Sequence, residues 1–200
     1  MSIAQRVALV EKLFHQLEQE SAQFEQASGL SCVSGCGKCC TYPNIEASPL
    51  EFLPWAFHLF LNGEAENTLN LLKKTQSKTC LIYKSLSLTG QGRCSNYKYR
   101  GLICRLFGFA ANTDKYGNLR LATCKIIKEG QAKKYNSTDE AITKGLHVPV
   151  FTEYYMQLNQ IDFHLGNKIV PVNKALQMAL EEVLHYYAYR PSPDSAKKCI

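Results

Sequence analysis

Nine cysteines stand out in the 200-residue chain, and four of them fall within the stretch CVSGCGKCC. These four are Cys32, Cys36, Cys39 and Cys40. Ala or Val could replace a buried thiol in most hydrophobic cores, so folding alone does not require this density of sulfur. Clustered cysteines usually bind a metal, form disulfides or carry redox chemistry. The stretch therefore predicts one of these three functions.

The composition favours metal binding over disulfides. The chain is 46% hydrophobic and 20% charged, which is typical of a globular domain. No apolar run approaches the roughly 18 residues that span a bilayer. Residues 1–26 carry a charge every few positions and lack the apolar block of a signal peptide, so we expect a cytoplasmic protein. Because the cytosol keeps thiols reduced, we expect the cysteines of this chain to bind metal ions and not to form disulfides.

The formal net charge of +6 would suit nucleic acid, but thiolates offset it. A zinc ion with four thiolate ligands lowers the net charge by about two, so two such sites would leave about +2. Several basic residues lie within a few positions of a cysteine, where they would balance thiolate charge: Lys38, Arg93, Arg100, Arg105 and Lys125. The sequence therefore gives no clear nucleic-acid site.

Helical patterns precede and follow the first cysteines. Apolar residues at helical spacing predict an amphipathic helix within residues 1–29, and Gly29 is expected to end it. A second helix is predicted within 48–63, where Ser48 and Glu51 can form a capping box. Pro54 would be tolerated near that start, or would displace it by one turn. A third helix is predicted from Glu64 to about Thr75.

The remaining chain alternates irregular and helical segments. Residues 78–124 show little helical periodicity, and a β-hairpin is predicted around a turn at Asp114–Asn118. Ser137 and Glu140 predict another capping box. Residues 150–165 and 171–190 both have helical patterns, the second with a clear apolar stripe.

We therefore expect a mainly helical α+β fold, with helices around an irregular, cysteine-rich metal-binding centre and a small β-hairpin. The expected organisation is an amino-terminal helix (1–29), a cysteine-cluster domain (30–125) and a helical extension (126–200). The extension carries too much apolar surface to remain in water, so we expect it to pack on the same domain.

The C-x-x-C spacing of Cys36 and Cys39 suits a metal knuckle, since Gly37 and Lys38 let the chain turn tightly between them. Tetrahedral zinc takes four sulfurs at about 2.3 Å, and a four-iron cluster also takes four. Cys40 follows directly, and neighbouring side chains diverge by about 100° on a helix. We therefore expect Cys40 to reach a second ion or another corner of a polynuclear centre.

Eight cysteines fall between residues 32 and 124 and are the predicted metal ligands: Cys32, Cys36, Cys39, Cys40, Cys80, Cys94, Cys104 and Cys124. The last four are far apart in sequence, so the fold must bring them together. Disulfides and unliganded buried thiols are the alternatives. Cys199 is interpreted as an incidental terminal thiol. Soft thiolates suit zinc and iron–sulfur clusters alike, so the metal stays open, as does the presence of more than one centre.

These cysteines resemble the pattern of the YkgJ-type cysteine-cluster family, a zinc- or iron-chelating domain. That pattern is a C-x(2,3)-C-x-x-C-C loop, a lone cysteine, a C-x-[IF]-[YF]…R-P-x-x-C-R segment and a later cysteine. Here CVSGCGKCC, Cys80, CSNYKYRGLICRLF and Cys124 match it, over roughly residues 30–125.

The resemblance extends to Tyr97, Arg100 and Arg105, while Gly101 stands where the family usually has Pro. It implies metal binding without a settled activity, and the same cluster occurs in flagellin lysine methylases. Tyr97 and Arg100 could donate hydrogen bonds to thiolates and tune a centre; an ordinary surface role is the alternative.

The sequence leaves two possible functions, one of a binding protein and one of an enzyme. The first is a metal-binding protein with zinc or an iron–sulfur cluster in a structural or redox role. The alternative is an iron–sulfur enzyme related to flagellin lysine N-methylases. The length of the chain favours the first, because 200 residues leave little room for a cosubstrate pocket beside the cluster.

Overall fold

The computed structural model describes residues 1–33, 36–86, 92–191 and 193, and Cys199 lies outside them. The α-helices are α1 (Ile3–Ser28), α2 (Leu53–Leu61), α3 (Ala65–Lys74), α4 (Leu102–Leu106), α5 (Lys125–Gly130), α6 (Ala132–Thr143), α7 (Phe151–Ile161), α8 (Phe163–Gly166) and α9 (Val172–Tyr187). Short 3-10 turns are η1 (Lys38–Thr41), η2 (Pro49–Phe52) and η3 (Tyr97–Tyr99). The predicted mainly helical α+β class is confirmed.

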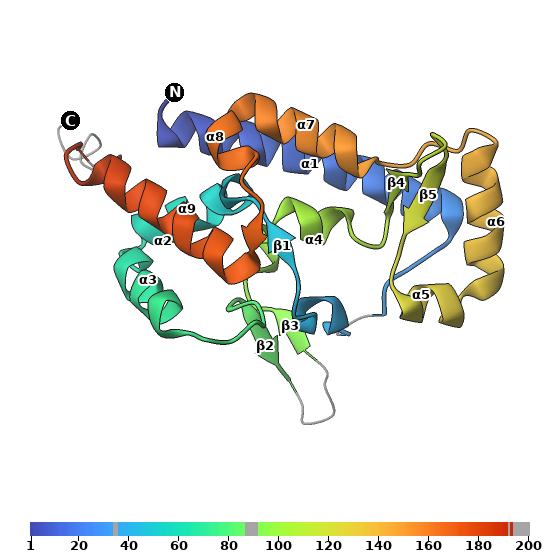
Figure 1. Ribbon diagram of the computed structural model, residues 1–200, viewed down its shortest axis with the longest axis horizontal. Coiled ribbons are helices and arrows are strands. Elements are labelled where there is room, and N and C mark those ends of the chain that lie inside the picture. The colour runs from blue at the N-terminus through green and yellow to red at the C-terminus, as the bar shows by residue number, and fades with distance from the viewer. Residues whose placement is uncertain (34–35, 87–91, 192, 194–200) are drawn as a thin grey trace.

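Helix α1 runs the length of one side of the molecule, beside α7 and above α4 (Figure 1). Helices α2, α3 and α9 pack together at one end, and β4, β5, α5 and α6 lie at the other. The turn η1 and the strands β2 and β3 lie along the side opposite α1. The turn η1 and strand β3, which carry Cys39, Cys40 and Cys94, therefore lie away from α1, whereas α4, which carries Cys104, packs against α1.

In the described part of the chain, the strands form three antiparallel pairs. These are β1 (Glu46–Ala47) with β6 (Val170–Pro171), β2 (Tyr83–Ser85) with β3 (Gly92–Cys94), and β4 (Ala110–Thr113) with β5 (Leu119–Ala122). The last pair is the predicted hairpin, closed where the N–H of Asp114 donates to the carbonyl of Asn118 (2.8 Å). The first pair joins residues more than 120 positions apart and has no signal in the sequence.

Local capping signals are confirmed at the first two helices. Helix α1 ends at Gly29, whose φ of 64° is the left-handed conformation that Gly tolerates best. The Ser48–Glu51 capping box forms, but it opens the 3-10 turn η2. Helix α2 then begins at Leu53 with Pro54 in its first turn. Pro54 thus displaces the α-helix by one turn, as its missing N–H and fixed φ require.

The predicted capping box at Ser137 is wrong. Helix α6 begins at Ala132, so Ser137 lies inside it, and its hydroxyl donates to the carbonyl of Lys134 (3.0 Å). Residues 150–165 form two helices instead of one, because Asp162 adopts extended backbone and its carboxylate caps α8 by accepting the N–H of Leu165 (3.1 Å).

Among the described residues, apolar side chains form two hydrophobic cores. The larger one joins α1, α2, α7 and α9, and it includes Leu176 and Leu180, both fully buried. The smaller one joins the end of α1 to the β4–β5 hairpin and α6, around Phe24 and Leu121. Arg6 links α1 to the carboxy-terminal segment through Asp162 (2.7 Å) and Glu182 (2.8 Å).

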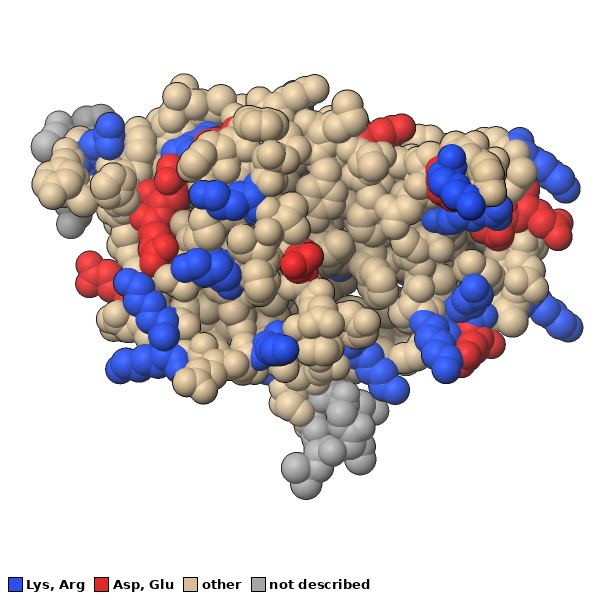
Figure 2. All heavy atoms as spheres, in the orientation of Figure 1, with Lys and Arg blue, Asp and Glu red and all other residues tan. Residues whose placement is uncertain are grey.

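The described surface mixes charges. On the face drawn in Figure 2, acidic side chains lie among the basic ones at both ends of the molecule. None of the helices in the described ranges combines the length and the apolar character needed to cross a membrane.

Candidate metal centre

The cysteine loop turns tightly at Gly37. This residue has a φ of 57° and begins η1, where the N–H of Cys40 donates to its carbonyl (3.0 Å). A Cβ at Gly37 would lie 2.3 Å from the carbonyl oxygen of Gly92 in β3. The turn therefore needs Gly both for its backbone conformation and for its close contact with β3.

Four further cysteines lie in or beside four different elements. Cys80 precedes β2, and its carbonyl accepts the N–H of Tyr83 (3.0 Å). Cys94 ends β3 directly opposite Tyr83. Cys104 lies in α4, and Cys124 is the N-cap of α5, where its Sγ accepts the N–H of Ile127 (3.5 Å). All eight thiols of the described residues are free.

Electrostatic coupling divides the thiols into two groups joined at Cys39. Burial raises the pKa of Cys104, and the neighbouring Cys80, Cys39 and Cys94 raise it further. Burial likewise raises the pKa of Cys32, with further contributions from Cys39, Cys124 and Cys36. Group A is Cys32, Cys36 and Cys124; group B is Cys40, Cys80, Cys94 and Cys104. Cys39 acts on members of both.

The sulfurs of Cys39 and Cys40 do not diverge as expected. Their Sγ atoms lie 4.0 Å apart, and the hydrogen bond between them lowers the pKa of Cys39 and raises that of Cys40. Both cysteines lie in the 3-10 turn η1. A separation of 4.0 Å is close to the ~3.8 Å edge of a zinc–thiolate tetrahedron with 2.3 Å bonds. The pair can therefore share an ion or join two adjacent ions.

The thiols are neighbours without being in ligating geometry. Across residues 1–33, 36–86 and 92–191, no three Cys, His, Asp or Glu side chains come close enough together to hold a metal ion. The eight predicted ligands are thus not assembled into a binding site among the described residues, and their role as ligands stays a prediction.

Arg100 is the basic residue that acts on these thiols. Its charge contributes to the lowered pKa of Cys39 and opposes the effect of burial on the pKa of Cys94. The guanidinium donates to the hydroxyl of Tyr97 and lies 4.1 Å from the centre of its ring. Tyr97 therefore orients Arg100, and no bond from Tyr97 to a thiol is found among the described residues.

Glu51 positions the segment that carries Cys104, a role that the sequence did not indicate. Its carboxylate accepts the N–H of Ser48 (2.8 Å), the N–H of Ile103 (2.9 Å) and the hydroxyl of Tyr155 (3.1 Å). Only 1% of Glu51 is exposed, and this burial raises the pKa of its carboxyl group. The capping box was readable from the sequence, but the bonds to Ile103 and Tyr155 join distant parts of the chain.

A comparison with models of protein families shows which family the chain belongs to. The family model "CxxCxxCC: Putative zinc- or iron-chelating domain" matches residues 31–140, which is more than half of the chain. The chain belongs to this family. The seven cysteines of groups A and B lie within the match, and so does Cys39. No curated protein and no solved structure matched the chain.

Gly101 is the residue at which this member of the CxxCxxCC family departs from the expected Pro. Its φ of −66° would also suit Pro, so the backbone is not the reason for Gly. A Cβ there would lie 2.8 Å from Cζ of Phe52 and 2.9 Å from Oε2 of Glu51. Gly101 therefore allows Glu51 to approach α4 closely enough to bond Ile103.

Proposed function

We propose that this chain chelates zinc or iron through eight cysteine thiolates, in a centre that holds more than one ion. Membership of a zinc- or iron-chelating family supports the chelation. The two coupled thiol groups with Cys39 between them support a centre of more than one ion. The proposed ligands are Cys32, Cys36, Cys39, Cys40, Cys80, Cys94, Cys104 and Cys124.

The exposure of the cysteine loop supports a structural role for the metal. None of the described residues between 31 and 46 is buried, so this segment has no hydrophobic core of its own. Thiolate–metal bonds supply folding free energy where apolar burial does not. Such bonds would join the loop to β3, α4 and α5, and the unit that they stabilise would be the cysteine-cluster domain of residues 30–125.

The raised thiol pKa values have a consequence for binding. A metal ion must displace the protons from Cys80 and Cys104, whose burial disfavours the thiolate form. A bound cation reverses this preference, because its charge stabilises each thiolate. The site therefore suits an ion that binds thiolates strongly, as zinc and iron both do.

The test is metal analysis with an absorption spectrum on protein purified without oxygen. Broad visible absorption with bound iron would indicate an iron–sulfur centre with a redox role. A colourless protein with stoichiometric zinc would indicate a structural centre. A chelator should then make the segment 31–46 sensitive to protease, whereas the Cys199→Ser variant should keep its metal. Protein that contains neither metal after anaerobic purification and reconstitution would refute the proposal.

A further inference from the structure

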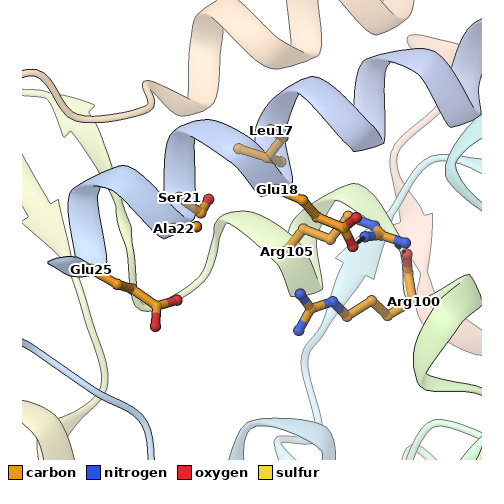
Figure 3. A pocket seen from close by; sticks show the side chains of 7 residues that line it. All are labelled: Leu17, Glu18, Ser21, Ala22, Glu25, Arg100 and Arg105. Atoms are coloured by element: carbon orange, nitrogen blue, oxygen red, sulfur yellow. Dashed lines mark hydrogen bonds and ion pairs between the residues drawn. The ribbon is translucent and has the colours of Figure 1, made fainter.

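A small pocket with four charged side chains in its lining lies between α1 and the segment that leads into α4 (Figure 3). Its volume is about 210 Å³. The lining residues are Leu17, Glu18, Ser21, Ala22, Glu25, Arg100 and Arg105. Two acidic and two basic side chains thus face a space that lies outside the thiol groups.

One of the two charge pairs is already satisfied. Arg105 forms an ion pair with Glu18, and its other guanidinium nitrogens donate to the carbonyls of Arg100 (3.0 Å) and Lys98 (2.6 Å). Its guanidinium also stacks over the ring of Phe14, 4.5 Å from the centre. Arg105 therefore forms a fixed wall of the pocket and is not free to bind a ligand.

Glu25 and Arg100 are the other two charged residues that line the pocket. Figure 3 shows the two side chains extending toward each other from opposite sides of the pocket. They form no ion pair within the described part of the chain, although the charge of Arg100 opposes the raised pKa that burial gives Glu25. Nε of Arg100 and the hydroxyl of Ser21 are also buried without a hydrogen-bond partner in this structure. The pocket thus presents a separated cation and anion with unused bonding capacity.

We propose that this pocket binds a small zwitterion of the α-amino-acid class, with its carboxylate on Arg100 and its ammonium group on Glu25. The opposite charges of the two side chains match the opposite charges of such a ligand, and a simple anion or cation would leave one of them unpaired. Pockets for drug-sized ligands occupy about 300–1,000 Å³, so a volume of about 210 Å³ suits a smaller molecule.

The pocket lies close to the cysteine thiols. The charge of Glu25 acts on the thiol of Cys32, and that of Arg100 acts on Cys39 and Cys94. A ligand between them would lie beside both thiol groups. The residues of the pocket would bind the ligand whichever metal the thiols hold, so ligand binding and metal chelation can be refuted separately.

The first experiment measures binding of chemical analogues to the wild-type, metal-containing protein. Isothermal titration with a panel of L-amino acids should find at least one that binds at millimolar concentration or below. The N-acetyl and carboxamide analogues of that amino acid should bind at least about tenfold more weakly, because each lacks one of the two charges. Absence of binding across the panel, or equal affinity for the analogues, would overturn the proposal.

The second experiment assigns the charges to residues. Glu25→Gln should lose the preference for the free amine over the N-acetyl analogue, and Arg100→Met should lose the preference for the free carboxylate over the carboxamide. Glu66→Gln, on the exposed side of α3, is the matched control and should keep both preferences. If Glu25→Gln retains the amine preference, the pocket is not the site. Metal content measured in parallel tests the proposed function, and its absence would leave the amino-acid result standing.

Discussion

The carboxylate of Glu51 accepts the N–H of Ile103 at 2.9 Å, which links the start of η2 to the helix that carries Cys104. The two residues are 52 positions apart in the chain. The same carboxylate also accepts bonds from Ser48 and Tyr155, so three segments meet at one buried group.

Replacing this carboxylate should weaken both the fold and the metal centre. Glu51→Ala leaves the buried N–H groups of Ser48 and Ile103 without acceptors, so we expect a loss of about 3 kcal/mol in the free energy of unfolding. Urea denaturation measures the loss, and metal analysis should show a lower metal content. Glu66→Gln should match the wild type in both measurements. Unchanged stability of Glu51→Ala would show that the network contributes nothing.

The turn at Gly37 should be more sensitive than an open glycine turn. Gly37→Ala combines a positive φ with a Cβ only 2.3 Å from the Gly92 oxygen, so we expect a cost above about 2 kcal/mol and a loss of bound metal. Gly117→Ala is the matched control, because its φ is 86° but no atom lies within 4 Å of the new Cβ. It should cost about 1 kcal/mol and retain the metal. Equal effects of the two variants on metal content would contradict the proposed contact between η1 and β3.

The number of ions per chain tests the proposal for Cys39 and Cys40. We expect more than one ion in the wild type, and we expect Cys40→Ser to lose part of the metal while the rest stays bound. Cys199→Ser should keep the wild-type amount. Elemental analysis of anaerobically handled protein gives the ratio. One ion per chain in the wild type would reject the multi-ion centre.

The carboxy-terminal helices should unfold together with α1. Arg6→Met removes the partner of both Asp162 and Glu182, and Arg6 itself is only 8% exposed. Because the two acids remain partly hydrated, we expect a cost of about 2 kcal/mol. Lys73→Met breaks only the exposed 3.9 Å pair with Glu181 and should cost less than about 0.5 kcal/mol. Proteolytic release of a stable, metal-containing fragment 1–130 would show that the carboxy-terminal helices form a separate unit.

The stability of the metal-free protein should fall in alkaline solution. Burial raises the pKa of Cys80 to about 11, against about 8.5 for an unfolded thiol. Between these values the unfolded chain loses the proton that the folded chain keeps, so the free energy of unfolding falls as pH rises, by up to about 1.4 kcal/mol per unit. Below about pH 8 this group contributes no slope. Urea unfolding at pH 8, 9 and 10 under reducing conditions should give a shallower decline for Cys80→Ser than for the wild type, and identical slopes would contradict the assignment.

Several local features of the fold could be predicted from neighbouring residues in the chain. The end of α1 at Gly29, the capping box of Ser48 and Glu51, and the hairpin turn at Asp114 each depend on residues within one turn of each other. Such signals are readable because the interacting groups are neighbours in the chain. Two local predictions were wrong: Ser137 does not cap a helix, because α6 begins at Ala132, and residues 150–165 form two helices, because Asp162 ends α7 and caps α8.

Contacts between distant residues could not be predicted in this way, because they depend on how the helices and hairpins pack. The spacing of Cys36, Cys39 and Cys40 predicts metal chemistry, but the 4.0 Å separation of the last two sulfurs in η1 could not be read from it. The coupling of Cys104 to Cys80 and of Cys32 to Cys124 depends on how α1, α4 and the short hairpins pack. The facing charges of Glu25 and Arg100 likewise come from elements 75 positions apart. These relations rest on the summed burial of two hydrophobic cores, which no local pattern of residues specifies.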